Sequence, residues 1–183
     1  ILLQLFGTMS LLLRLFTRRS PFEFFGAIRT ILVTALSTSS SNATLPTSIK
    51  VSREKLGVSA STAGFVLPLG ATLNMSGTAL YEGCVVLFIA QVYDVPLSFS
   101  GQIMLLLLAV LSAVAVAGIP GASLPLIIAL LANFHIPPEG IGLILGIDRV
   151  LDMARTVLNV AADVVIACIV DEQVRPPDRP DTG

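Results

Sequence analysis

The chain has 183 residues and a net charge of −1, and 54% of its residues are hydrophobic while 13% are charged. Soluble domains contain about 25% charged residues, and the mean hydropathy of this chain is +0.88. These values exclude an ordinary soluble protein. They predict an all-α membrane protein in contact with lipid, with no nucleic-acid partner. Apolar runs of roughly 20 residues, the length of a helix that crosses a bilayer, begin near Ile1, Gly64, Gln102 and Ile141.

The first apolar run, residues 1–17, opens on Ile rather than Met and lacks the arrangement of a cleaved signal peptide. We interpret it as the end of a membrane helix. We therefore expect the chain to be a fragment whose preceding helices are missing.

The basic residues are concentrated in two places. Several lie between Arg14 and Lys55, two lie in the C-terminal tail at Arg175 and Arg179, and no Lys or Arg occurs from Leu56 to Asp148. Loops rich in Lys and Arg stay on the cytoplasmic side of a membrane. The pattern predicts that residues 18–55 and the tail, residues 172–183, are cytoplasmic and that residues 91–101 and 133–140 lie outside.

Residues 20–57 contain an apolar segment that is interrupted before it could cross a membrane. "SPFE" at its start has the pattern of a capping box with Pro at the first helical position. The helix then meets "STSSSNATLP", whose hydroxyl and amide side chains compete for backbone hydrogen bonds. We expect Pro46 to start a second short helix that ends near Gly57. A segment that enters, breaks and returns is a re-entrant hairpin.

Residues 62–93 form an outward-going span with a polar centre. The sequence "GATLNMSGTA" combines Gly, Asn, Ser and Thr, and these residues favour local unwinding near residues 74–76. Unwinding would free carbonyl oxygens for a small cation. The alternative interpretation is a stripe of small residues that allows close helix packing.

Residues 101–135 would be one long membrane helix except for "AGIPGAS", in which Gly118, Pro120 and Gly121 break it. This break resembles the earlier one, "PGASLP" against "SNATLP". Paired broken helices mark the binding sites of transporters with internal repeats. We predict a second re-entrant hairpin, with two unrelated kinks as the alternative.

Residues 138–171 form an apolar helix that carries a stripe of polar residues. At 100° per residue the stripe falls within about 80° of the helix circumference. Its members are Asp148, Asp152, Arg155, Asn159 and Asp163. A charge left in lipid costs roughly 2.5–3.5 kcal/mol, so the stripe is predicted to face protein or a polar cavity. The alternative is that Asp152 and Arg155 only neutralise each other.

Four stretches resemble the signature motifs of the glutamate transporter homologues, the dicarboxylate/amino acid:cation symporter family. They are "TSSSNATLP", "LPLGATLNMSGTALYE", "AGIPGAS" and "ILGIDRVLDMARTVLNVAAD". The resemblance covers nearly all of residues 1–172 and implies a fold of eight membrane helices and two hairpins. Residues 1–17, 62–93 and 138–171 would belong to the sixth, seventh and eighth helices, and residues 20–57 and 101–135 to the inner and outer hairpins. Together they would form a mobile transport domain. Family members are homotrimers, and their subunits contact one another through scaffold helices that this chain lacks.

The resemblance also assigns site residues. Asp152 would pair with a substrate ammonium and Arg155 with a side-chain carboxylate, for which a guanidinium offers a planar fork. The substrate-binding set that it implies is Ser39, Ser40, Ser41, Thr78, Ile119, Ser123, Asp152, Arg155, Thr156 and Asn159. Sodium would be held by Gly70, Asn74, Asn159 and Asp163, and a second ion by Thr72 with the outer hairpin backbone.

The sequence departs from the family at a few site positions. Ser76 stands where the family usually has Asp, so the resemblance implies one sodium ion fewer. Ser123 stands where Gly is common. Thr38 and Met153 replace positions that often carry Arg, and Arg149 is the expected substitute.

The resemblance implies a secondary active symporter of aspartate or glutamate, coupled to Na⁺ or H⁺, with elevator-type alternating access in a bacterial inner membrane. The alternatives are a C4-dicarboxylate symporter and a truncated, inactive remnant. We do not expect an enzyme, because the apolar spans contain no His that could serve as a base beside the Ser run. A passive channel would not need two occluding hairpins.

Overall fold

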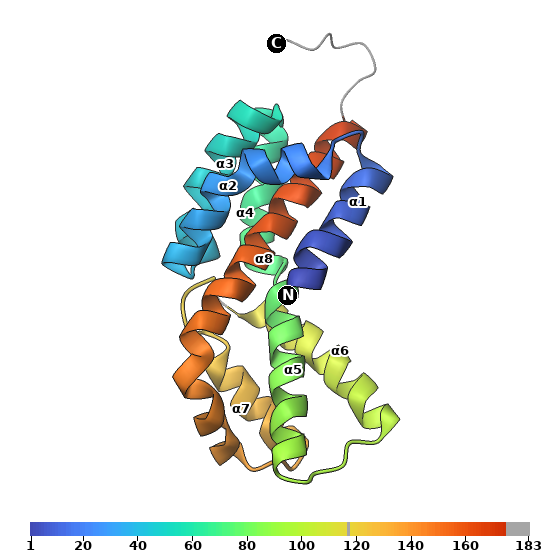
Figure 1. Cartoon of the computed structure of the whole chain (residues 1–183), viewed down its shortest axis with the longest axis vertical. Helices are drawn as coiled ribbons and strands as arrows, with labels where there is room; N and C mark the ends of the chain where they lie inside the picture. The colour runs from blue at the N-terminus through green and yellow to red at the C-terminus, as the bar shows by residue number, and fades with distance from the viewer. Residues whose placement is uncertain (117, 175–183) are drawn as a thin grey trace.

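The computed structural model describes residues 1–116 and 118–174, and all the regular structure in this part is helical. Figure 1 shows an elongated bundle in which one long helix, α8, runs through both halves of the molecule. The expectation of an all-α fold is confirmed. The helices are η1 (Leu3–Thr8, a π-helix), α1 (Met9–Phe16), α2 (Pro21–Thr38), α3 (Ser41–Leu56), α4 (Ala60–Leu73), α5 (Ser76–Val92), α6 (Phe99–Ala115), α7 (Leu124–Asn133), η2 (Pro138–Ile141, a 3-10 helix) and α8 (Gly142–Val174).

Two apolar cores lie at opposite ends of the bundle. The first combines side chains of α1 to α4 with the C-terminal half of α8, including Leu13, Ile28 and Leu158. The second combines α5, α6, α7 and the N-terminal half of α8, including Val86 and Ile127. Because α8 passes from one core to the other, its middle lies between the two apolar cores. The helix ends that meet near the middle of α8 lie between the cores as well.

At the predicted inner hairpin, α2 and α3 lie side by side (Figure 1). The helix α2 begins at Pro21 as predicted, although the Ser20 side chain does not make the capping hydrogen bond. The prediction that Pro46 starts the second helix is wrong. The helix α3 begins at Ser41 and contains Pro46, because the Ser40 hydroxyl accepts a hydrogen bond from the Ala43 N–H and caps the helix earlier. It ends at Leu56 and is followed by Gly57, which has a φ of 64° and forms the C-cap.

Two further interruptions lie between the cores. The helices α4 and α5 are separated by Asn74 and Met75, which have non-helical backbone angles. The helix α6 ends at Ala115 and α7 begins at Leu124, with Gly121 at a φ of 74° in the connection. Within the predicted break "AGIPGAS", residues 117–123, residue 117 lies outside the described residues. The predicted tail begins inside α8, and residues 175–183 also lie outside the described part.

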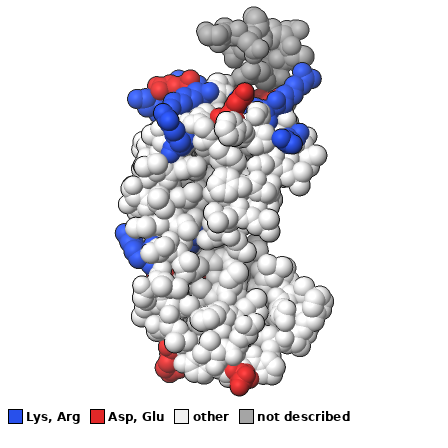
Figure 2. Space-filling view, viewed as in Figure 1, with Lys and Arg blue, Asp and Glu red and all other residues white. Residues whose placement is uncertain are grey.

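The outer surface of the bundle is strongly apolar. Figure 2 shows charged atoms gathered at both ends of the molecule and a broad uncharged band between them, with one basic group on its side. On α6, the exposed side chains include Phe99, Ile103, Leu107 and Leu111. The stretches Ala60–Val92 and Pro138–Val174 are long and apolar enough to cross a membrane. The surface is that of a protein in contact with lipid or with other membrane helices.

Candidate functional site

The polar stripe of α8 is buried, as predicted. The exposed fractions of Asp148, Asp152, Arg155, Asn159 and Asp163 are 7%, 2%, 3%, 3% and 4%. The stripe therefore faces protein at the level where α4 ends and α5 begins. Two connections approach α8 there, which we call the inner connection (residues 39–40, between α2 and α3) and the outer connection (residues 116–123, between α6 and α7).

Arg155 lies at the centre of this cluster and is held from three sides. Its Nε and Nη2 atoms lie 2.9 and 2.8 Å from Asp152 Oδ1, one helical turn earlier. Its Nη1 atom donates a hydrogen bond to the Ser123 hydroxyl of the outer connection. The guanidinium carbon lies 4.8 Å from the centre of the Tyr81 ring on α5. A buried guanidinium with these partners has a fixed position and a fixed plane.

The Tyr81 ring and the second Asp152 oxygen are themselves held. The Tyr81 hydroxyl donates to Asp148 Oδ1 at 2.5 Å, which fixes the ring below the guanidinium. The Gly121 N–H donates to Asp152 Oδ2 at 3.0 Å. Arg149, which is 59% exposed, has its Nη1 atom 3.8 Å from the same oxygen and so lies near the predicted ammonium partner.

The two hairpin connections contact each other above this cluster. The Ser40 hydroxyl donates to the Gly118 carbonyl at 2.6 Å, and the Asn42 N–H approaches the same oxygen at 3.4 Å. A Cβ atom on Gly118 would lie 3.1 Å from the Ala71 carbonyl, so this position favours glycine. The two breaks that resemble each other in sequence thus meet in space, and the outer one contacts Asp152 and Arg155.

A second polar cluster surrounds Asp163. Its Oδ1 atom accepts a hydrogen bond from the Asn74 amide at 2.8 Å, and a Cβ atom on Gly70 would lie 2.5 Å from the same oxygen. Among the described residues no Lys or Arg lies within ion-pair distance of this buried carboxylate. Buried charges are normally paired or bound to a metal ion. The uncompensated carboxylate beside the break in α4–α5 fits a small hard cation such as Na⁺.

Asn159 lies on α8 one helical turn from both Arg155 and Asp163. Its Oδ1 atom accepts from the Gly77 N–H at 2.7 Å, and its amide donates to the Thr78 hydroxyl at 3.1 Å. The side chain thus bonds to the first turn of α5 at two points. It holds the start of α5 against α8, between Arg155 and Asp163.

The remaining predicted residues fall into two groups. Ser39, Ser41 and Thr156 are buried, and the Thr156 hydroxyl donates to the Asp152 carbonyl at 2.8 Å. Thr72 and Ile119 are exposed; the Thr72 hydroxyl donates to the Leu69 carbonyl of its own helix at 2.8 Å. The binding roles of all the predicted site residues, Thr72 and Ile119 included, stay predictions.

Sequence reasoning missed two buried polar contacts. The first is the Tyr81–Asp148 pair described above. The second is Glu82, which is fully buried and accepts a hydrogen bond from Ser112 of α6. The available signal was that Glu82 is an acidic residue within an otherwise apolar run.

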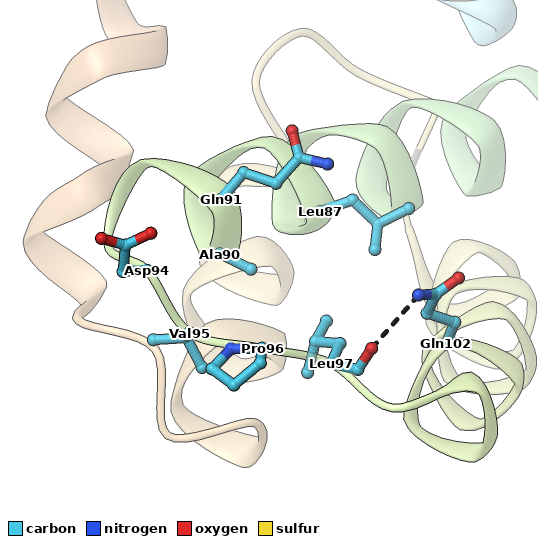
Figure 3. A pocket seen from close by; sticks show the side chains of 8 residues that line it. All are labelled: Leu87, Ala90, Gln91, Asp94, Val95, Pro96, Leu97 and Gln102. Carbon is cyan, nitrogen blue, oxygen red and sulfur yellow. Dashed lines mark hydrogen bonds between the residues drawn. The ribbon is translucent and has the colours of Figure 1, made fainter.

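A cavity of about 330 Å³ lies elsewhere, at the end of the bundle near the α5–α6 loop. Figure 3 shows its lining residues from Leu87 to Gln102, with the Gln102 side chain bonded to the Leu97 carbonyl. Asp94 is its one charged lining residue. None of the predicted site residues lines this cavity, so it is distinct from the candidate site.

Comparison with known proteins agrees with the geometry. Residues 1–173 match the Sodium:dicarboxylate symporter family. The chain is 43% identical over 165 residues to the human Excitatory amino acid transporter 1, covering 90% of this chain and 30% of that protein. It is 42% identical over 165 residues to the Excitatory amino acid transporter 4 of Rattus norvegicus, covering 90% and 29%. It is 40% identical over 171 residues to the Putative sodium-dependent excitatory amino acid transporter glt-4 of Caenorhabditis elegans, covering 93% and 34%.

The chain thus spans about a third of the length of these relatives. The family match extends over almost the whole chain, and the relatives are membrane transporters rather than enzymes. The chain is an integral membrane protein and belongs to the Sodium:dicarboxylate symporter family.

Proposed function

We propose that this chain is the substrate-binding and ion-binding part of a secondary active symporter that couples the uptake of an acidic amino acid to Na⁺. The observation that carries the proposal is the contact between buried Asp152 and Arg155, directly below the meeting point of two helix breaks. A ligand with both an ammonium and a carboxylate group matches this pair of opposite charges.

The substrate would bind to polar groups that the cluster leaves available. Asp152 would accept the substrate ammonium, and Arg155 would bind the side-chain carboxylate through two parallel N–H groups. The Ser39–Ser41 tip and the first turns of α3 and α7 would supply backbone N–H groups for the α-carboxylate. Thr78, Thr156 and Asn159 would complete the hydrogen bonds from α5 and α8.

Sodium would bind where Asp163 lies without a basic partner. Backbone carbonyls at Gly70, Asn74 and Asn159 would join its carboxylate, and Thr72 would serve a second ion with the outer connection. The cation supplies positive charge that compensates Asp163, and hard oxygen ligands suit it. Asn159 lies one helical turn from both Arg155 and Asp163 and bonds to the start of α5, so an ion at Asp163 would fix the residue that also faces the substrate. The relatives' names support sodium over H⁺ as the coupling ion.

The full-length protein would work by an elevator type of alternating access. In this mechanism, α2–α3 and α6–α7 would be re-entrant hairpins. The whole bundle would move against scaffold helices that belong to the rest of the protein. The exposed apolar side chains of α6 offer a surface for such helices and for lipid. We expect a homotrimer in a cell membrane with the C-terminus cytoplasmic. The bacterial inner membrane stays a prediction from the sequence.

The experiment is uptake of labelled L-aspartate by liposomes that contain the full-length protein carrying this chain, with an inward sodium gradient. We expect uptake that stops when the gradient is removed, and much weaker uptake of succinate. Uptake of succinate but not aspartate would instead favour a C4-dicarboxylate symporter. Absence of both activities would indicate an inactive remnant.

The 183-residue chain alone provides a second test. We expect it to insert into membranes but to form no trimers and to transport nothing, because the scaffold surface is absent. Chemical cross-linking and the same uptake measurement would check this. Coupled uptake by the isolated chain would contradict the need for a scaffold.

A further inference from the structure

The hydrogen-bond donors of Arg155 are largely occupied inside the protein. A guanidinium has five N–H groups. Of these, Nε–H and one Nη2–H point to Asp152, and one Nη1–H points to Ser123. Among the contacts of the described residues, two N–H groups are therefore left for a ligand. A carboxylate that binds them must do so without displacing a guanidinium that is anchored at both of its ends.

This anchoring fixes how far apart the charges of a ligand can lie. Asp152 and Arg155 are one turn apart on α8, and their charged atoms are 2.8 Å apart. An acidic amino acid that binds both must bring its ammonium and its side-chain carboxylate to neighbouring positions. In aspartate one methylene group separates the α-carbon from that carboxylate, and in glutamate two do. The geometry is suited to the shorter ligand.

Ser123 is the residue that prevents the arginine from adapting. Its side chain is fully buried, it belongs to the outer connection rather than to α8, and it holds Nη1 from the side opposite to Asp152. An unanchored arginine could swing away from Asp152 on its flexible stem. Tyr81 restrains the plane of the guanidinium but forms no hydrogen bond with it among the described residues. Ser123 is thus the contact that keeps the two charges close.

We infer that Ser123 is a specificity-determining residue, and that its hydroxyl makes the site select the four-carbon acidic amino acid, aspartate, over glutamate. The inference rests on the proposed function, because it assumes that Asp152 and Arg155 bind the two ends of the substrate. Loss of the hydroxyl frees Nη1 and lets the guanidinium move, so the longer acid can be accommodated. One methylene group changes affinity in a fitted pocket by roughly 10- to 200-fold.

The test is equilibrium binding of L-aspartate and L-glutamate to the full-length protein in detergent with sodium present. The wild type is compared with Ser123→Ala, Ser123→Gly and a control, Ser100→Ala, whose hydroxyl lies 3.0 Å from Ser98 at the start of the same hairpin. We expect the wild type to prefer aspartate by about tenfold or more. Both Ser123 variants should reduce that preference at least fivefold, mainly by binding glutamate more tightly, and Ser100→Ala should not change it.

Two results would overturn the inference. An unchanged aspartate-to-glutamate ratio in both Ser123 variants would show that the hydroxyl does not set the length of the ligand, and would leave the proposed function intact. Failure of the folded wild type to bind either acid would overturn the proposed function as well. Equal effects of Ser123→Ala and Ser123→Gly would assign the selectivity to the hydroxyl, whereas an effect of Ser123→Gly alone would assign it to the Cβ atom and contradict the hydroxyl role.

Discussion

The two hairpin connections meet at the same place but are built differently. The inner one joins α2 to α3 through two residues, Ser39 and Ser40, and the Ser40 hydroxyl caps the next helix. The outer one joins α6 to α7 over residues 116–123, and Ser123, at the N-cap of α7, makes no capping hydrogen bond with its side chain.

The contacts of the two connections with the site differ as well. The described contacts that tie the outer connection to α8 are those of Gly121 with Asp152 and of Ser123 with Arg155. A substrate ammonium would compete with Gly121 for Asp152, whereas the Ser123 contact leaves other N–H groups of Arg155 for a ligand. Among the described residues, the hydrogen bonds of the inner connection go to α3 and to Gly118 rather than to Asp152 or Arg155. We therefore expect the outer connection to open while the ligand enters and to close again on it, and the inner one to remain in place.

The largest expected effect follows from removing the residue that binds both the ligand and the outer connection. Arg155→Cys should weaken L-aspartate binding by more than about 100-fold, since a charge-assisted bidentate pair is lost. Small neutral amino acids should still bind through Asp152. Hydrogen exchange should rise in α6–α7 and not in α2–α3. Retained aspartate affinity would contradict the assignment of Arg155.

The inner connection should be most sensitive to Ser40. The variant Ser40→Ala removes both the helix cap at Ala43 and the bond to the Gly118 carbonyl, so we expect about 2 kcal/mol less stability against unfolding. Urea titration in detergent, followed by circular dichroism, would measure it. Ser37→Ala is the matched control, because that exposed hydroxyl bonds only to the Val33 carbonyl of its own helix. Equal stability of the two variants would show that the cap is unimportant.

The junction between the connections can be disturbed from the outer side. In Gly118→Ala the new Cβ atom would lie 3.1 Å from the Ala71 carbonyl and from the Asn42 side chain, so the outer connection must shift by a few tenths of an ångström. We expect aspartate binding to weaken about fivefold, or about 1 kcal/mol, while α2–α3 keeps its hydrogen-exchange protection. Loss of protection in α2–α3 would show that the inner connection depends on the outer one.

The smallest effect concerns backbone conformation. Ser39 has a φ of 50° and its buried hydroxyl has no partner among the described residues, so Ser39→Gly should stabilise the protein by up to about 1 kcal/mol. Gly121 has a φ of 74° in the outer connection, and Gly121→Ala should destabilise by a similar amount. Urea titration would compare the two. A destabilising Ser39→Gly substitution would indicate that the hydroxyl has a structural partner.

The sequence was sufficient to predict features that depend on one segment. The breaks at Asn74 and Gly118–Gly121 and the buried stripe of α8 follow from residue types and helical period, and the structure contains them. Pro46 was misinterpreted because proline is compatible with a helix that another residue has already capped. The Tyr81–Asp148 and Glu82–Ser112 pairs join different helices. An aromatic or acidic residue within one apolar run does not indicate which helix will lie beside it.

The most direct test of the account is the dependence of aspartate affinity on sodium concentration. We propose a cation at Asp163 and the substrate at Asp152 and Arg155. Asn159, one helical turn from both Arg155 and Asp163, bonds to the first turn of α5. Binding of L-aspartate to the full-length protein should therefore tighten by about tenfold or more for each tenfold rise in sodium, because the ion and the substrate bind to the same folded cluster. Asp163→Asn should reduce the steepness of this dependence by about one sodium ion, because the proposed second ion at Thr72 remains. Equal aspartate affinity in sodium chloride and in choline chloride would contradict the central claim that the two sites are coupled.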